Sequence, residues 1–175
     1  MLVNLYFRNT SLLPVHGFGY LIPRSIPFNQ NPEYALGVVF DSEAIAGQDT
    51  APGTKITVML GGHWWNDWVA FPDEADAKGM AMNVLTRHLG IVEEPECVNA
   101  VLQRDCIPQY VVGHENTLRS ANEELSKAYG GRVRIAGGAY TGVGVNDCVR
   151  SALDAVKGLR DDPSRGTGLE RFADG

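Results

Sequence analysis

The sequence predicts an α+β fold, with strands concentrated in the first part of the chain and helices interleaved with strands later. Residues 3–7 ("VNLYF"), 34–40 ("YALGVVF") and 55–60 ("KITVML") have the composition and patterning of strands. Residues 73–89 and 115–129 place apolar side chains at helical spacing. A third observation is the stretch "AGGAYTGVGVND" at 136–147, where four glycines separate a strand-like run from a helix-like run.

Composition narrows the class of protein. With 175 residues, the chain is long enough for one domain or for pieces of two. Its net charge of −6, from 15 basic and 21 acidic residues, argues against a nucleic-acid partner. No run approaches 18 apolar residues, so we expect no transmembrane segment. The opening "MLVNLYFRNT" has neither a signal-peptide nor a transit-peptide pattern.

The reactive residue types form no recognisable site. Three cysteines without a C-x-x-C motif predict reduced thiols, and the four histidines lack metal-ligand spacing. Cys106 and His114 sit in no activating motif, which argues against a Cys–His nucleophile. Asp147 stands at a helix start, where a carboxylate is more often a cap than a base. We therefore nominate no catalytic residue and no metal ligand.

The two middle helices have clear apolar faces and clear ends. The stripe of the first helix is Ala77, Met80, Ala81, Val84 and Leu85, and that of the second is Leu118, Ala121, Leu125 and Ala128. Gly90 is a natural C-cap for the first helix, and Gly130–Gly131 end the second. Between the helices, "CVNAVLQ" alternates as a strand and Pro108 interrupts the region that follows.

The glycine-rich stretch predicts a strand, a turn and a helix N-terminus. Residues 132–135 alternate polar and apolar, and Asn146 or Asp147 can cap a helix whose apolar positions are Val149, Ala152, Leu153 and Val156. Such an arrangement is a common anion cradle, although a tight turn that packs a helix on a sheet is the plainer alternative. Asp147 replaces the third glycine of G-x-G-x-x-G, and no second strand follows. These residues therefore do not make a complete Rossmann unit, and we expect at most an incomplete Rossmann-type fold.

Three tryptophans follow a glycine pair. Trp64, Trp65 and Trp68 come directly after Gly61–Gly62 at the end of a predicted strand. The alternative to a binding role is that they are ordinary core or surface aromatics. Trp64 is the best placed to stack on a flat ligand, because it lies nearest the strand end. An aromatic wall together with an anion cradle suits a ligand with both rings and phosphates, such as FAD.

Four collinear segments resemble one family. "GFGYLIP", "TVMLGGHWW", "RDCIPQYVVGH" and "AGGAYTGVGVNDCVRSA" look like the C-terminal third of protoporphyrinogen oxidase, a flavoprotein oxidoreductase of the flavin amine oxidase superfamily. The resemblance runs from about residue 3 to residue 159, and "CIPQY" with "GVGVNDC" is its most specific pair. It implies that Val143, Gly144 and Val145 touch FAD, that Gly138 and Gly142 shape the turn, and that Trp64 contacts the cofactor.

The resemblance also implies a division of the chain. Residues 1–131 would be the mixed-sheet, C-terminal part of a substrate-binding domain. Residues 132–159 would be the strand-turn-helix that closes an FAD-binding domain, and residues 160–175 a disordered tail. The dinucleotide-binding unit of the family has no counterpart here, so the chain looks like the end of a longer protein.

Function follows from the same resemblance. The full enzyme would oxidise protoporphyrinogen IX to protoporphyrin IX with oxygen as acceptor, in porphyrin and haem biosynthesis. It would form a homodimer, lie peripherally on the mitochondrial inner membrane, and bind the porphyrinogen through its upstream half. This chain alone would be inactive and would retain little FAD. The alternatives are a non-catalytic truncated binding module and a fragment of another flavin amine oxidase.

Overall fold

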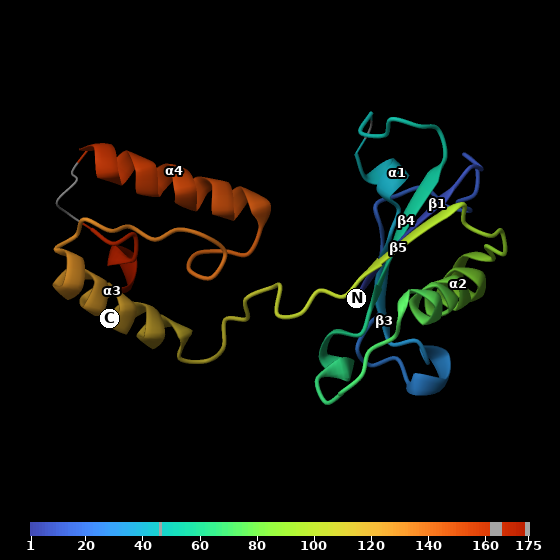
Figure 1. Cartoon of the computed structure of the whole chain (residues 1–175), viewed down its shortest axis with the longest axis horizontal. Helices are drawn as coiled ribbons and strands as arrows, with labels where there is room; N and C mark the ends of the chain where they lie inside the picture. The colour runs from blue at the N-terminus through green and yellow to red at the C-terminus, as the bar shows by residue number, and fades with distance from the viewer. Residues whose placement is uncertain (46, 162–165, 174–175) are drawn as a thin grey trace. The chain divides into compact units, whose positions relative to one another are not determined.

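The computed structural model describes residues 1–45, 47–161 and 166–173, and the chain forms two compact units (Figure 1). The first unit is Met1–Arg104 and the second is Asp105–Gly175. The helix at 114–129 therefore belongs with the glycine-rich segment and the C-terminal residues, and not with the sheet. The family-based boundary at 131/132 concerns the domains of a longer protein and stays a prediction.

A five-stranded sheet forms the centre of the first unit. Its strands are β1 (Leu2–Phe7), β2 (Gly19–Leu21), β3 (Ala35–Val39), β4 (Thr54–Leu60) and β5 (Cys97–Val101), in the order β2-β3-β4-β1-β5. Every neighbouring pair is antiparallel, so the prediction of a mixed sheet was wrong. The reason is that β1 lies between β4 and β5 and runs opposite to both, so the helix that joins β4 to β5 does not make them neighbours.

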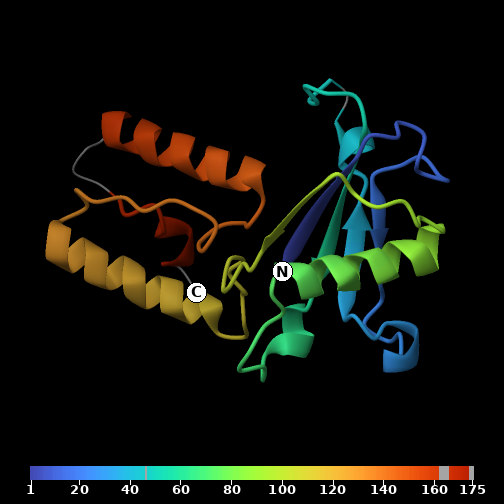
Figure 2. The same cartoon turned by 45° about the vertical axis from the view of Figure 1, so that its right-hand side comes forward.

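One face of this sheet is covered by α2 (Glu74–Leu89), which Figure 2 shows lying across the strands. Val3, Leu5 and Phe7 alternate into the core with facing residues of β4, as the sequence predicts. The predicted stripe of α2 packs against them: Ala77, Ala81, Val84 and Leu85 are buried, and Met80 packs at the edge of the core. Asp73 caps the helix by accepting from the Asp76 N–H, and Gly90 ends it in the left-handed conformation.

Shorter helices complete the first unit. They are η1 (Phe28–Gln30), α1 (Asp41–Ala44) and η2 (Gly62–Trp65). The sheet face away from α2 carries a polar chain in which Asn4 donates to the Thr57 hydroxyl at 2.7 Å and Thr57 donates to Asp41 Oδ2 at 2.7 Å. These bonds tie β1, β4 and α1 together.

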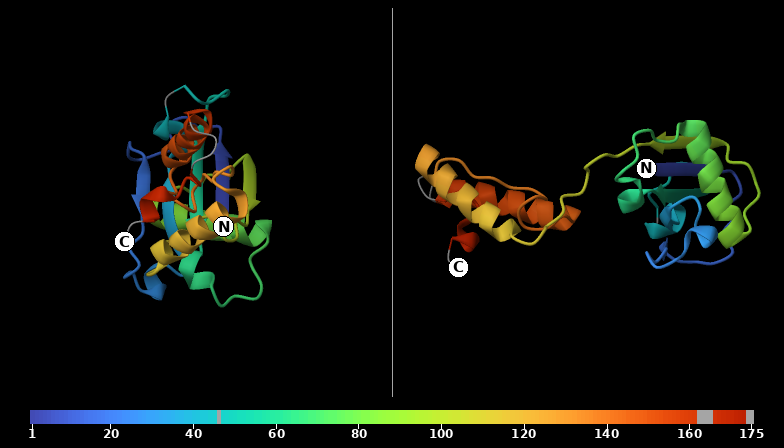
Figure 3. Two further views of the ribbon diagram at one scale, coloured as in Figure 1. Left: turned by 90° about the vertical axis from the view of Figure 1, so that its left-hand side faces the viewer. Right: turned by 90° about the horizontal axis from the view of Figure 1, so that it is seen from below.

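The second unit consists of two long helices and the segments around them. α3 is His114–Tyr129, α4 is Val145–Asp161, and a short helix η3 follows at Glu170–Phe172. The segment that joins α3 to α4 runs back between the two helices, so both helices point the same way (Figures 1 and 3). Only Leu118 of the predicted α3 stripe is fully buried, and Ala128 is exposed.

The strand predicted at 132–135 does not form, and the prediction was wrong. A strand needs a neighbour to accept its N–H groups and donate to its carbonyl groups, and the second unit has no sheet within its described residues. Ile135 instead donates its N–H to the Thr167 carbonyl at 2.8 Å.

The described part of the C-terminal tail is structured. α4 extends through Arg160 to Asp161, η3 forms further on, and the side chains of Thr167 and Leu169 are fully buried. Over residues 166–173 the structure therefore differs from the expected disordered tail. The rest of that expectation falls on residues 162–165 and 174–175, which lie outside the described residues. Across 1–45, 47–161 and 166–173, no helix is both long and apolar enough to cross a membrane.

Candidate functional site

The glycine turn leads directly into α4. The helix begins at Val145, and its first backbone bond runs from the Cys148 N–H to the Gly144 carbonyl at 3.0 Å. Asn146 and Asp147 are thus inside the first turn instead of in front of it, and the predicted cap position was wrong by two or three residues. The carboxylate of Asp147 still lies at the helix N-terminus, where the helix dipole favours negative charge.

Two of the glycines are explained by packing inside the chain. A Cβ added to Gly142 would lie 2.6 Å from the Asp147 carboxylate carbon, and one added to Gly144 would lie 3.0 Å from Asp147 Oδ2. Gly138 is less crowded, since its added Cβ would lie 3.5 Å from the sulfur of Cys148. The turn therefore closes tightly over the first residues of α4, and Asp147 fills the space beside it.

The outer surface of the turn is apolar and open. Val143 and Val145 are 51% and 80% exposed, so both project from the turn without a covering partner in the described chain. Five of the six predicted cofactor residues (Gly138, Gly142, Val143, Gly144 and Val145) are brought together here. This surface presents backbone and two aliphatic side chains to anything that approaches the N-terminus of α4.

Residues of the "CIPQY" region hold the turn from the other side. The Tyr110 hydroxyl donates to the Gly138 carbonyl, and Nε2 of His114 donates to the Ala139 carbonyl at 3.0 Å. The rings of Tyr110 and His114 stack, with centroids 4.7 Å apart and planes 6° apart. Sequence reasoning missed both residues as supports of the site. The sequence offered one signal for them, which is that "CIPQYVVGH" and the glycine turn occur in the same chain. That joint occurrence does not indicate that the two segments are in contact.

The face of α4 that meets the glycine segment is lined by small residues. Ser151 accepts a hydrogen bond from the Gly137 N–H at 3.1 Å, and Cys148 lies against Gly138 and Gly142. Cys148, Ser151, Ala155 and Gly158 are all partly buried. The opposite, apolar stripe is exposed: Val145 80%, Val149 53%, Leu153 64% and Val156 65%. α4 thus turns these four small residues toward the glycine segment and presents its large apolar residues to the outside of the unit.

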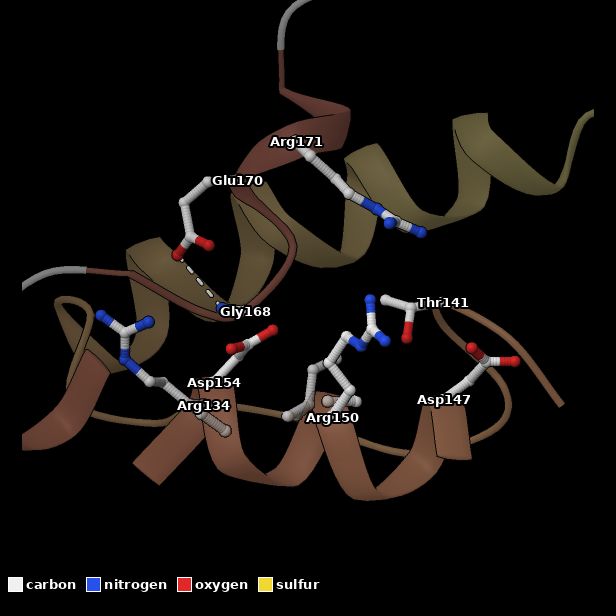
Figure 4. A pocket seen from close by; sticks show the side chains of 11 residues that line it. Arg134, Thr141, Asp147, Arg150, Asp154, Gly168, Glu170 and Arg171 are labelled. Carbon is white, nitrogen blue, oxygen red and sulfur yellow. Dashed lines mark hydrogen bonds between the residues drawn. The ribbon is translucent and has the colours of Figure 1, made fainter. Parts of the chain in front are cut away.

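A charged pocket of about 340 Å³ lies beside the turn, between α4 and the C-terminal segment (Figure 4). Its ionic side chains are Arg134, Asp147, Arg150, Asp154, Glu170 and Arg171. Glu170 accepts from the N–H groups of Thr167 and Gly168. Burial opposes its ionisation, but these backbone bonds and the Arg134 guanidinium outweigh burial and lower the pKa of Glu170. With three guanidinium groups and three carboxylates, the pocket is balanced in formal charge and offers no purely cationic surface to phosphates.

The sixth predicted residue, Trp64, belongs to the first unit. It lies in η2, half-buried, with its ring 4.1 Å from the His63 ring and 6.1 Å from the Tyr34 ring. Trp65 is the core residue of the cluster, 4% exposed and stacked on Trp68. Gly61 makes room for it, because an added Cβ would lie 2.3 Å from the Trp65 ring. Gly61 therefore has a packing role, and Trp64 keeps free surface.

The remaining reactive groups are dispersed. Cys97, Cys106 and Cys148 are free thiols, and the first two are exposed. Within the described ranges, no three His, Cys, Asp or Glu side chains are grouped so that they could hold a metal ion.

Comparison with known proteins gives one consistent result. No family profile matches the chain. It is 38% identical over 159 residues to protoporphyrinogen oxidase of Schizosaccharomyces pombe. The match covers 90% of this chain and 31% of that relative. It is also 38% identical over 158 residues to the human protein of the same name. That match covers 88% of this chain and 32% of the human protein. A shorter match, 32% identical over 81 residues, covers 46% of this chain and 17% of coproporphyrinogen III oxidase from Bacillus subtilis.

A solved structure agrees at the level of the fold. The crystal structure of an Exiguobacterium sp. 255-15 protein assigned as a protoporphyrinogen oxidase superposes with a TM-score of 0.72 at 24% identity. The superposition covers 92% of this chain and 34% of that one. The chain therefore spans about a third of the length of the relatives that it matches.

Proposed function

From the finding that the chain is homologous to protoporphyrinogen oxidases over about a third of their length, we propose that it is the C-terminal portion of such an enzyme. The whole protein oxidises protoporphyrinogen IX to protoporphyrin IX with oxygen as acceptor, a step of haem biosynthesis. The observation that carries this proposal is the 38% identity maintained across 90% of the chain. The contacts of Tyr110 with Gly138 and of His114 with Ala139 support it, because they join two of the segments that carry the resemblance, "RDCIPQYVVGH" and "AGGAYTGVGVNDCVRSA".

The cofactor of this proposal is FAD, and the geometry of the turn favours a particular part of it. Val143 and Val145 are exposed and apolar, which suits the flat, uncharged flavin ring. The Asp147 carboxylate lies beside Gly142 and Gly144, where it would repel a pyrophosphate. Val143, Gly144 and Val145 would contact the ring system, and Gly138 and Gly142 would shape the turn. We also propose Trp64 as a cofactor contact, on the family resemblance alone. When bound, FAD supplies the hydride acceptor.

The residues of this chain would position the cofactor ring, and we assign them no part in proton transfer. The backbone of the turn is fixed by Ser151, Tyr110 and His114, so a ring that rests on Val143 and Val145 meets a surface set in advance. No side chain at the turn is placed as an acid, base or nucleophile, and we assign none. The dinucleotide-binding unit and the porphyrinogen pocket belong to the remaining two thirds of the protein.

The cellular setting follows from the same relationship. We propose peripheral association of the whole protein with the mitochondrial inner membrane, a homodimeric assembly, and no nucleic-acid partner. A non-catalytic module is a less favoured alternative, as is a piece of another flavin amine oxidase, because the curated relatives at 38% identity carry the name protoporphyrinogen oxidase.

A chimera tests the proposal. The matching third of the Schizosaccharomyces pombe relative is replaced by this chain, and bound flavin and protoporphyrinogen IX oxidation are measured. We expect a yellow, active protein, whereas the chain by itself should retain little or no FAD. A folded chimera that binds flavin as the parent does but leaves protoporphyrinogen unoxidised would overturn the proposed activity. Stoichiometric FAD on the chain alone would overturn the proposal that its site is incomplete.

A further inference from the structure

The C-terminal residues Gly166–Phe172 lie against the segment that the sequence predicts as a strand. The Ile135 N–H donates to the Thr167 carbonyl at 2.8 Å. Gly168 also approaches this residue so closely that an added Cβ would lie 2.6 Å from the Ile135 carbonyl oxygen. Both polar backbone groups of Ile135 are thus covered by this short segment.

The segment is anchored by two fully buried side chains. Thr167 and Leu169 are each 0% exposed. The Thr167 hydroxyl donates to Asn122 Oδ1 at 2.6 Å and accepts from the Leu169 N–H at 3.1 Å. Arg119 adds a bond from its Nε to the Phe172 carbonyl at 3.1 Å. Asn122 and Arg119 both lie on α3, so the segment bridges that helix and Ile135.

Its conformation is set locally. Glu170 accepts hydrogen bonds from the backbone N–H groups of Thr167 and Gly168, which closes a turn before η3. Gly166 and Gly168 have φ of +102° and +87°, a region that other residues adopt at a cost. These features indicate a segment with one defined conformation. Figure 4 shows the hydrogen bond between Glu170 and Gly168 at the rim of the charged pocket.

An extended segment with unpaired backbone groups readily accepts another strand. Residues 132–135 have the alternation of a strand, yet the Ile135 N–H bonds to Thr167 instead of to a sheet, and the Arg132 N–H bonds to the Tyr129 carbonyl. We propose that Gly166–Phe172 is an intrachain strap that occupies the strand-forming edge of residues 132–135. An added strand reaches that edge only after the strap leaves. The occupant of the edge in this chain is the strap itself, held by Thr167 and Leu169.

Amide hydrogen exchange at Ile135 tests the strap in the full chain. Gly168→Ala places a methyl group against the Ile135 carbonyl oxygen and should push the strap from the edge. Gly113→Ala is the matched control, because Gly113 has φ of +88° and no heavy atom lies within 4 Å of its added Cβ. Both substitutions fall on a glycine of similar positive φ, and only the first carries the clash. We expect the Ile135 amide to exchange about tenfold faster or more in Gly168→Ala than in Gly113→Ala. Equal rates in the two variants would overturn the proposal.

A peptide provides the second measurement. The synthetic peptide GTGLERFA, which copies residues 166–173, is added to the Gly168→Ala protein. It should slow exchange at Ile135 toward the wild-type rate by taking the vacated edge. The same peptide with aspartate at the position of Leu169 should not, because a charge there enters a fully buried site. If neither peptide slows exchange, or if both do equally, the edge does not recognise the strap and the proposal fails.

Discussion

The phenolic hydroxyl of Tyr110 donates a hydrogen bond to the carbonyl of Gly138, 28 residues further along the chain. It connects the loop before α3 to the turn before α4. His114 repeats the connection one residue later, at Ala139. The conformation of the glycine turn therefore depends on side chains that lie outside it.

Tyr110→Phe should loosen the turn without unfolding the unit. The substitution removes the bond to Gly138 and leaves the ring stacked on His114. Loss of one such bond costs about 0.5–1.5 kcal/mol, and the low end applies because Tyr110 is 46% exposed. Tyr129→Phe is the control, since Tyr129 is 48% exposed and its hydroxyl makes no hydrogen bond within the described chain. Amide exchange in α4 should be faster for Tyr110→Phe only; identical rates would show that the bond carries no stability.

Gly144→Val should weaken flavin binding more than it weakens folding. In the chimera, the larger side chain intrudes where the ring would rest, at about 1–3 kcal/mol, or roughly 5- to 150-fold in occupancy. The nearest atom to an added Cβ is a carboxylate oxygen of Asp147 at 3.0 Å, which a small rotation can move, so the cost to folding is slight. Gly144→Ala should be mild. Bound flavin and the melting temperature of the apoprotein distinguish the two effects. Unchanged flavin content in Gly144→Val would rule out a contact at this position.

Stability of the first unit should depend on the protonation of His88. Burial lowers the pKa of His88, with a further contribution from Arg87, and burial raises the pKa of Tyr20 to about 12. Both neutral forms are thus favoured in the folded state, where the Tyr20 hydroxyl and His88 Nδ1 are 2.9 Å apart. The stability that these two neutral groups contribute to the folded first unit is fully present between about pH 6.5 and 10. It declines as pH falls through the lowered pKa of His88, or rises through that of Tyr20.

Urea unfolding followed by tryptophan fluorescence measures this dependence, because all three tryptophans lie in the first unit. The free energy of unfolding should fall between pH 7 and pH 5 in the wild type. His88→Gln should flatten the curve over that range. A His88→Gln profile as steep as the wild type would assign the dependence to other groups.

Arg87→Met should destabilise the first unit strongly. Arg87 Nη1 donates to Glu33 Oε1 at 3.0 Å and Nη2 to Oε2, and the Glu33 side chain is only 7% exposed. Removing the guanidinium leaves a buried carboxylate without its partner, at a cost of roughly 3 kcal/mol. The Arg8–Glu96 pair has similar geometry but lies in solvent, so Arg8→Met is the control and should change little. Equal midpoints for the two variants in urea would contradict this ranking.

Local patterns were enough to predict most of the first unit. β1, β3, β4 and α2 were predicted because each has its own periodicity, and α2 also has a capping residue and a glycine end. The sheet type was not predictable in this way, since pairing depends on which strands become neighbours. The same limit explains residues 132–135, whose alternation is real but whose neighbour is a turn of the strap and not a strand.

The sequence predicted that five of the candidate residues share one turn, but it did not predict the side chains that support this turn. Their role in binding stays a prediction. Glycine spacing identified the turn between Gly138 and Val145, and the helix behind it formed as expected. The bond from Tyr110 could not be predicted, because hydrogen bonds between distant side chains leave no periodic trace. Asp147 was predicted as a cap, whereas it lies inside the first turn of α4 and its side chain fills the space beside Gly142.

In α4, small residues face inward and valines face outward. This arrangement determines which substitutions natural selection would tolerate on each face of the helix. In the chain alone, enlarging Ser151 or Gly158 should be harmful, whereas changing Val149 or Val156 to a polar residue should be neutral. Inside a longer relative, where more chain is available to cover the valines, both faces would come under constraint. A survey of tolerated variants, made once in the chain alone and once in the chimera, would thus show which face of α4 is constrained in each of the two proteins.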